Sequence, residues 1–292
     1  MARRPAAAQT AYGPMLILAV EQFVPRAQRI VVDPFALRML PRWMWLTAQA
    51  GRWRWLRELG ETGSDREALG VWGGLQCRKR YVRDQARRAL AEGIGQLVVL
   101  GAGLDTVAYQ LAMPAGVPAW EVDMPENIAV KRDRVRAVFS GIPAGVHLVP
   151  VRFESDDLEK SLSAAGFRAD VPTMFVWEAV TQYLTEQDVR RTLAFLAKAV
   201  TGSRLIFTFV RKDFLDGTNM YGAESLYRRF AHNHLWKFAL DPSDIDPLLR
   251  EYGWAEREQV GAAEYTERYL RPAGREDLTV SDIEHFVYAE KL

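Results

Sequence analysis

The pattern of apolar and polar positions changes at about residue 76. Beyond that point, apolar runs of strand length alternate with longer segments of helical period, a pattern typical of a parallel sheet flanked by helices. Residues 241–260 read as a helix, a glycine turn and a strand, and residues 283–292 read as a closing strand. Five earlier runs are also candidate strands, at residues 96–101, 118–123, 146–151, 173–178 and 204–210. The pattern therefore predicts about seven strands.

Two segments carry clear helix signals. Residues 185–202 begin with Thr185 as a helix N-cap and Asp188 three residues on, and Gly202 is the expected C-cap. Residues 75–93 have apolar positions at helical spacing, with basic residues on the opposite face. This second helix should lead directly into the strand at residues 96–101.

Residues 1–75 and 211–240 fall outside the alternation. Both are candidate lids over the carboxyl ends of the strands, where ligands bind in such sheets. We expect a helical, substrate-covering cap at residues 1–75 and a main domain at residues 76–292 with a lid insertion at residues 211–240. Seven strands, at least one of the late ones antiparallel, predict an α/β fold: the seven-stranded doubly wound sheet of class I methyltransferases.

Tryptophans and arginines are concentrated in the predicted cap. The tryptophans fit helix packing and the lining of a pocket for a large apolar substrate about equally well. The arginines fit either pairing with a substrate carboxylate or a solvated face. The residues are Trp43, Trp45, Trp53, Trp55 and Trp72, together with Trp236 from the predicted lid, and Arg42, Arg52, Arg54 and Arg57.

Composition narrows the class of partner. Apolar residues make up 49% of the chain and charged residues 26%, the balance of a globular protein. The net charge of +1 gives no general reason to expect nucleic acid or an anionic membrane as a partner. We therefore expect a small-molecule substrate and leave the oligomeric state open.

The single cysteine and the N-terminal sequence indicate the cellular compartment of the protein. Cys77 is the single cysteine, so an intramolecular disulfide and a cysteine-based metal site are excluded, and a reducing compartment suits the chain. The apolar run that follows Arg3 and Arg4, from Met15 to Val20, is too short for a signal peptide. No run approaches the roughly 18 apolar residues of a spanning helix. We expect a soluble, cytoplasmic protein.

Three predicted strand ends carry residues that suit a cofactor. Gly101 and Gly103 follow the first strand and would let the backbone approach a ligand closely. Asp123 ends the second strand, where a carboxylate in this layout accepts hydrogen bonds from ribose hydroxyls. Glu178 ends the fourth strand and should emerge at the same edge of the sheet, where it would meet an ammonium group. The spacing therefore indicates a cofactor that contains ribose.

The glycine loop distinguishes between two such cofactors. The third glycine of the dinucleotide motif is absent, and Asp105 and Thr106 stand where a helix would receive a pyrophosphate. A carboxylate there repels a diphosphate and favours a cation. S-adenosylmethionine carries a sulfonium and an ammonium and no phosphate, so the loop favours it over NAD. For the loop taken alone, the simpler alternative is a tight strand-to-helix turn in an apolar core.

Six sequence stretches together resemble the leucine carboxyl methyltransferase-like family of S-adenosylmethionine-dependent O-methyltransferases, which includes bacterial members of unassigned substrate. The resemblance implies a class I methyltransferase sheet with a helical cap, Arg78 on the cofactor carboxylate, Asp123 on the ribose and Glu178 near the amino group. The stretches are residues 33–36, 77–84, 96–111, 121–132, 175–184 and 261–275. We predict the cofactor-binding residues to be Arg78, Gly101, Ala102, Gly103, Asp105, Asp123, Met124, Phe153, Glu154 and Glu178.

The chain departs from the family pattern at three positions. Leu18 stands where relatives carry a second basic ligand for the cofactor carboxylate, and Arg152 stands where they carry an acidic residue near the adenine. Glu154 or Asp156 could take the latter role at a different spacing. Ala179 replaces the usual glycine after Glu178. These departures imply cofactor binding that is weakened or rebuilt around other residues.

The acceptor group stays open. A carboxylate acceptor is already ionised and needs no base, whereas a hydroxyl needs one, for which the candidates are His232, His234 and Tyr183. The two histidines fit packing or surface positions better, and alone they make a poor metal site.

We predict a small-molecule O-methyltransferase of specialised metabolism that acts on an apolar carboxylate or hydroxyl compound. The first alternative is a protein C-terminal carboxyl methyltransferase, which would need an open groove. The second is a dinucleotide oxidoreductase, which the absent glycine and Asp105 disfavour. The third is a repurposed member with weakened cofactor binding.

Overall fold

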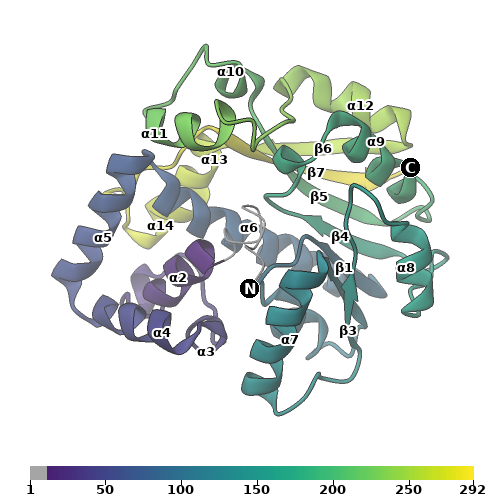
Figure 1. The fold of residues 1–292 in the computed structure, drawn as a ribbon, viewed down its shortest axis with the longest axis horizontal. Coiled ribbons are helices and arrows are strands. Elements are labelled where there is room, and N and C mark those ends of the chain that lie inside the picture. The colour runs from purple at the N-terminus through teal and green to yellow at the C-terminus, as the bar shows by residue number, and fades with distance from the viewer. Residues whose placement is uncertain (1–11) are drawn as a thin grey trace.

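The predicted sheet is present in a computed structural model that describes residues 12–292 (Figure 1). Its strands lie in the order β3-β2-β1-β4-β5-β7-β6. Strands β1 to β5 are parallel, and β7 is antiparallel to both of its neighbours. The strands are β1 (Gln96–Leu100), β2 (Ala119–Asp123), β3 (Val146–Pro150), β4 (Thr173–Trp177), β5 (Arg204–Val210), β6 (Trp254–Val260) and β7 (Glu284–Lys291). The prediction of an α/β, seven-stranded doubly wound methyltransferase sheet is confirmed.

Helices cover both faces of this sheet (Figure 1). Helices α6 and α7 pack on one face, and α8, α9 and α12 pack on the other. The first described helices, α2 to α5, lie beyond α6. The helices are α2 (Tyr12–Glu21), α3 (Ala36–Met39), α4 (Arg42–Gln49), α5 (Arg54–Glu67), α6 (Val71–Ala91), α7 (Pro125–Phe139), α8 (Leu158–Ala164), α9 (Glu186–Leu196), α10 (Lys212–Leu215), α11 (Glu224–Leu226), α12 (Ile245–Glu251), α13 (Ala262–Tyr265) and α14 (Arg271–Ala273).

Burial on both faces explains why the central strands were visible in the sequence. Along β1, Leu97 and Val99 contribute to the core under α6, while Val98 and Leu100 contribute to the core under α8 and α9. Successive side chains of a strand point to opposite faces, so a strand covered on both sides reads as a continuous apolar run. The chain order reverses between β1 and β4, and ligands bind at such switch points in doubly wound sheets.

Helix α9 confirms one predicted end and corrects the other. Thr185 and Asp188 form the predicted capping box at its start. The helix ends at Leu196 with Ala197 as the C-cap, so the prediction of Gly202 as C-cap is wrong. A turn separates the helix from β5, and Gly202 lies in that turn with a positive φ of 89°.

Residues 12–75 form helices joined by loops, and buried charges connect them to the rest of the described chain. Asp33 is fully buried and accepts hydrogen bonds from Arg83 of α6 and from Thr106 after β1. Arg275, near the C-terminal end, lies close to Glu21 of α2 and Glu61 of α5. The Asp33 contacts connect the helical segment to α6 and to the loop that follows β1, and the Arg275 contacts connect it to the segment that follows α14. Arg3 and Arg4 lie outside the described residues.

Residues 211–240 form short helices and loops beside the helical segment. Phe214, Ala223 and Trp236 pack against Ala68 and against Ile283 in a third apolar cluster. The segment therefore contacts both the region before α6 and the edge of the sheet near β7. Across residues 12–292, no helix combines the length and the apolar character needed to cross a membrane.

Candidate functional site

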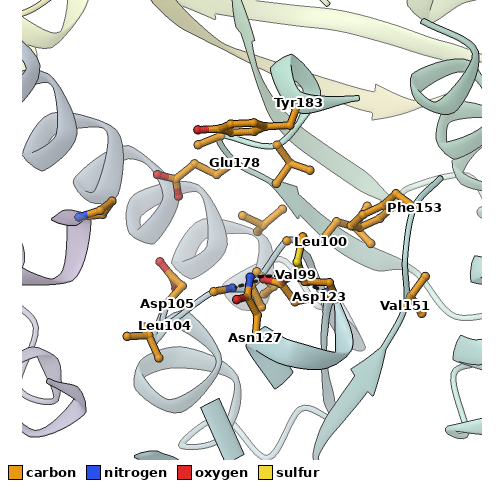
Figure 2. Close-up of a pocket in the computed structure, with 18 of the residues that line it drawn as sticks. Val99, Leu100, Leu104, Asp105, Asp123, Asn127, Val151, Phe153, Glu178 and Tyr183 are labelled. Carbon is orange, nitrogen blue, oxygen red and sulfur yellow. Dashed lines mark hydrogen bonds between the residues drawn. The ribbon is translucent and has the colours of Figure 1, made fainter. Parts of the chain in front are cut away.

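A pocket of about 170 Å³ lies at the carboxyl ends of β1 to β4. Each of the four strands contributes a lining residue at or next to its carboxyl end, namely Leu100, Asp123, Val151 and Val176. Leu18 of α2 also lines the pocket. Glu178 and Tyr183 lie on one side, facing Asp105 and Asp123 on the other (Figure 2). We call this cavity the first pocket.

All the residues predicted to bind the cofactor line the first pocket. They come from α6, from the loop after β1, from the end of β2 and from the segments after β3 and β4. They are Arg78, Gly101, Ala102, Gly103, Asp105, Asp123, Met124, Phe153, Glu154 and Glu178. The structure thus brings together residues that are up to 100 positions apart, and their role in binding stays a prediction.

The glycine loop is anchored on β2. The N–H groups of Gly101 and Ala102 both donate to the carbonyl of Val122, at 2.8 and 2.9 Å. Gly101 has a φ of 72°, and a Cβ on it would lie 2.1 Å from Cγ2 of Val180. Glycine is therefore required where the loop passes beneath the segment that follows β4.

Asp123 holds this loop and the start of α7 together. Its Oδ2 accepts from the N–H of Gly103 at 2.6 Å, and its Oδ1 accepts from the N–H of Met124 and from Asn127. Burial raises the pKa of Asp123, and these donors act in the opposite direction. A carboxylate oxygen has two lone pairs, so Asp123 retains acceptor capacity toward a ligand in the pocket.

An alternating chain of charges runs along one wall of the first pocket. Arg78 binds Glu178 at 2.8 Å and also binds Glu284. Lys79 binds Glu178 at 2.9 Å and Asp105 at 2.6 Å. Among residues 12–292, the lining of the first pocket as a whole contains four carboxylates and three cations, so it carries one excess negative charge: the carboxylates are Asp105, Asp123, Glu154 and Glu178, and the cations are Arg78, Lys79 and Arg152. Such a wall favours a ligand with net positive charge.

The charged forms of this network are stabilised by one another. Burial opposes the ionised form of Asp105, but the charges of Lys79 and Arg83 outweigh it and hold the pKa of Asp105 well below its usual range. Burial likewise opposes the charged form of Lys79, whose pKa is nevertheless raised by Asp105 and Glu178. Lys79 and Asp105 are therefore both ionised at neutral pH.

The two charge-altering departures from the family pattern also line the first pocket. Leu18 is fully buried there and brings no charge, whereas Lys79 does bring a second cation beside Arg78. Arg152 makes an ion pair with Glu126 at 2.7 Å. Asp156 accepts from the N–H of Arg152, while Glu154 lines the pocket.

The third departure from the family pattern, Ala179 in place of glycine, affects the backbone conformation. Its φ is 57°, in the left-handed region that a residue with a Cβ rarely adopts. This conformation costs about 1–2 kcal/mol for an L-residue, which explains why glycine suits this position better. The strain falls at the wall of the pocket, directly after Glu178.

A second pocket of about 250 Å³ adjoins the first. The two share Pro14, Arg78, Ala179 and Tyr183 as lining residues. Aromatic and apolar side chains make up most of its wall, including residues of the predicted lid. We define the second pocket by Arg78, Gln182, Tyr183, Trp236, Tyr265 and Glu284.

Of the three candidate bases, one lies at the pockets and two do not. Tyr183 lines both pockets. His232 and His234 are exposed and belong to the wall of neither pocket, so the structure does not bring them to the site. Within residues 12–292, no three His, Cys, Asp or Glu side chains converge as a metal site would need.

The tryptophans of the helical segment as a group match neither of the two interpretations from the sequence, helix packing and the lining of a substrate pocket. Trp72, in the first turn of α6, is buried in the core, and Trp236 lines the second pocket. The arginines of the same stretch line neither pocket, and Arg57 among them is half-buried and donates to the carbonyl of Gly51. Four other tryptophans are exposed in and between α4 and α5 and line neither pocket. These four are Trp43, Trp45, Trp53 and Trp55, with exposed fractions of 66%, 43%, 58% and 64%.

Sequence reasoning missed several residues of the site. Lys79 follows Arg78 directly in a stretch that matched the family, and that adjacency was the available signal. Asn127 lies one helical turn after Asp123 and donates to it. Glu284 lies 206 residues from Arg78, and no local pattern links them.

Comparisons with known proteins agree with this geometry. The family model described as leucine carboxyl methyltransferase matches residues 11–197. A Mycobacterium marinum protein named "Putative S-adenosyl-L-methionine-dependent methyltransferase" is 33% identical over 221 residues, 72% of this chain and 69% of that protein. A Mycolicibacterium gilvum protein of the same name is 29% identical over 195 residues, 62% of each chain. This chain thus matches about two thirds of the length of these relatives.

Two solved structures share the fold. One is titled as a putative methyltransferase from Thermobifida fusca, with a TM-score of 0.54 and 17% identity over 79% of this chain and 86% of that one. The other is a DUF574 family protein from Streptomyces avermitilis, with a TM-score of 0.56 and 14% identity over 84% and 90%. The chain belongs to the leucine carboxyl methyltransferase family of S-adenosylmethionine-dependent methyltransferases.

Proposed function

We propose that this protein is an O-methyltransferase that acts on a small, apolar metabolite with a carboxylate or hydroxyl group. The observation that carries the proposal is the pair of adjoining pockets, one charged and one lined mostly by aromatic and apolar side chains, which share Arg78, Ala179 and Tyr183. Such a pair suits a polar cofactor beside an apolar acceptor. We place the activity in specialised metabolism and in the cytoplasm, where the single buried thiol of Cys77 stays reduced.

The residues of the first pocket fit S-adenosylmethionine. Asp123 would accept from the ribose hydroxyls, and Met124 and Phe153 would contact the adenine. Arg78 and Lys79 would hold the carboxylate of the methionine part, with Glu178 and Asp105 near its ammonium. Bound there, the cofactor supplies a methyl group on a sulfonium. Its net charge of +1 matches the one excess negative charge of the described residues that line the first pocket.

The same residues fit a dinucleotide poorly. Asp105 accepts from the N–H of Val107 at 2.7 Å and so occupies the helix start that a pyrophosphate would need. Its charge is fixed by Lys79 and would repel phosphate. This argues against the oxidoreductase alternative.

Lys79 also argues against weakened cofactor binding. The alternative of a repurposed member rested on the loss of a basic ligand at Leu18. Because Lys79 and Arg78 lie side by side in the same pocket, the carboxylate would still meet two cations. The chain's own residues would therefore orient the cofactor without a contribution from position 18.

Product chemistry separates a small-molecule enzyme from a protein carboxyl methyltransferase. The purified protein is incubated with methyl-labelled S-adenosylmethionine and either a panel of apolar hydroxyl and carboxylate compounds or a peptide ending in a leucine carboxylate. We expect label in a small compound. Mild alkali then releases labelled methanol from a methyl ester but not from a methyl ether. Label found solely in the peptide would contradict the proposal.

A further inference from the structure

The second pocket contains buried polar atoms without a hydrogen-bond partner among the described residues. They are Oε1 of Gln182, Nε1 of Trp236 and the hydroxyl of Tyr265. The exposed fractions of these residues are 2%, 8% and 2%, and all three line the pocket. Buried polar groups in proteins are nearly always hydrogen-bonded. All three atoms belong to side chains that line one cavity, which points to a ligand that carries polar groups and pairs with them.

Aromatic rings give this pocket its shape. Trp236 is stacked on Phe230 with ring centroids 5.2 Å apart, and its edge meets Tyr183 at 6.4 Å. Together with Tyr265, these rings form walls that suit a planar apolar ligand.

The charges of the second pocket disfavour an anionic acceptor. In the part of its wall that the structure describes, Arg78 is the sole cation and Glu284 the sole carboxylate. Arg78 is held by both Glu178 and Glu284. An acceptor carboxylate would lose its hydration and lie near Glu284, and the sole cation in this wall, Arg78, would already be engaged by Glu178, by Glu284 and by the cofactor carboxylate. A neutral hydroxyl meets none of these penalties.

Glu284 has one oxygen engaged and one available. Its Oε2 accepts from Arg78, while its buried Oε1 has no partner among residues 12–292. The carboxylate is therefore fixed in the wall of the second pocket, beside Arg78, which lines both pockets, and it has a lone pair that can receive a proton.

We propose that the acceptor is a neutral hydroxyl on a planar aromatic ring, and that Glu284 receives the hydroxyl proton during transfer. This inference rests on the proposed function. The acceptor oxygen forms a bond to the methyl carbon as the carbon–sulfur bond breaks, and the electron pair of that bond remains on sulfur. The proton passes to Oε1 of Glu284, which later releases it to solvent. Arg78 holds the carboxylate through Oε2.

The first experiment measures binding with two probes of the same shape. Protein saturated with S-adenosylhomocysteine is titrated in a calorimeter with 2-naphthol, which is neutral at pH 7, and with 2-naphthoate, which is ionised. We expect 2-naphthol to bind about tenfold more tightly than 2-naphthoate. Equal or tighter binding of 2-naphthoate, or binding of neither probe, overturns the inference. Failure of S-adenosylhomocysteine itself to bind would instead overturn the proposed function.

Matched tyrosine variants test the unpaired polar atoms. Tyr265→Phe keeps the ring and removes the hydroxyl, whereas Tyr269→Phe makes the same change outside the pocket. We expect 2-naphthol affinity to fall about fivefold in the first variant and to stay at the wild-type value in the second. Equal affinities in both variants contradict a ligand contact at Tyr265.

Matched glutamate variants test the proton step. Glu284→Gln keeps an oxygen for Arg78 but receives a proton poorly, and Glu290→Gln makes the same change on β7 where the side chain binds Tyr288 and Arg257. We expect Glu284→Gln to bind S-adenosylhomocysteine and 2-naphthol as the wild type does, with methyl transfer to 2-naphthol slowed about 100-fold. Transfer within about tenfold of wild type overturns the role of Glu284. So does wild-type protein that binds 2-naphthol and transfers no methyl group.

Discussion

Gly101→Ala should destabilise the protein by an amount that the structure resolves into two parts. The first is conformational, because the φ of 72° costs an alanine about 1–2 kcal/mol. The second is steric, because the new Cβ would lie 2.1 Å from Cγ2 of Val180, and overpacking of this kind costs about 1–3 kcal/mol. The lower entropy of the unfolded alanine variant offsets about 0.4–1 kcal/mol. We expect a net loss of about 1–5 kcal/mol.

Two companion variants separate these parts. Gly116 has a φ of 68°, and a Cβ added to it would have nothing within 4 Å, so Gly116→Ala carries the conformational part alone. Val180→Ala removes Cγ2, so adding Gly101→Ala to it should cost about as little as Gly116→Ala does. The free energy of unfolding is measured by urea titration followed by circular dichroism. The reasoning is refuted if Gly101→Ala costs the same with and without Val180, or costs no more than Gly116→Ala.

The remaining predictions concern charged groups. Asp123→Ala should weaken S-adenosylmethionine binding at least about tenfold, or 1.4 kcal/mol, by calorimetry, and an unchanged Kd would mean that the ribose site lies elsewhere. Lys79→Met should weaken S-adenosylhomocysteine binding about tenfold by calorimetry. An unchanged affinity would mean that Arg78 alone binds the carboxylate of the ligand. Burial raises the pKa of Glu21 from 4.5 to about 7, so its contribution to stability is greatest below pH 4.5 and is lost as the pH rises through 7. Glu21→Gln should therefore gain about 3 kcal/mol over wild type between pH 4 and pH 8 in urea titrations, and a constant difference would contradict the assigned pKa.

The sheet was predictable because burial leaves a clear pattern. Strands β1, β2 and β4 are fully buried, β5 is nearly so and the edge strand β3 is partly buried, and each lies within a run identified from the sequence. The start of α9 was equally visible, since Thr185 and Asp188 sit at fixed spacing. Its end was not, because the turn before β5 begins at Ala197 without a glycine, and Gly202 comes five residues later.

Site residues were predictable where a residue type with a characteristic role stands at the end of a strand. Gly101, Asp123 and Glu178 follow three strands, and parallel strands bring their carboxyl ends to one edge. Contacts between distant segments leave no such signal. Local spacing in the sequence could predict neither the ion pair between Glu284 and Arg78 nor the position of Leu18 in the wall of the first pocket.

Direct titration of the purified protein tests the central claim, that the first pocket binds S-adenosylmethionine. Separate calorimetric titrations use S-adenosylmethionine, S-adenosylhomocysteine and NAD, with the Asp123→Ala protein as control. The account predicts saturable binding of both sulfur-containing ligands, weakened in the variant, and no heat with NAD. Binding of NAD, or no heat with either sulfur-containing ligand, would contradict it.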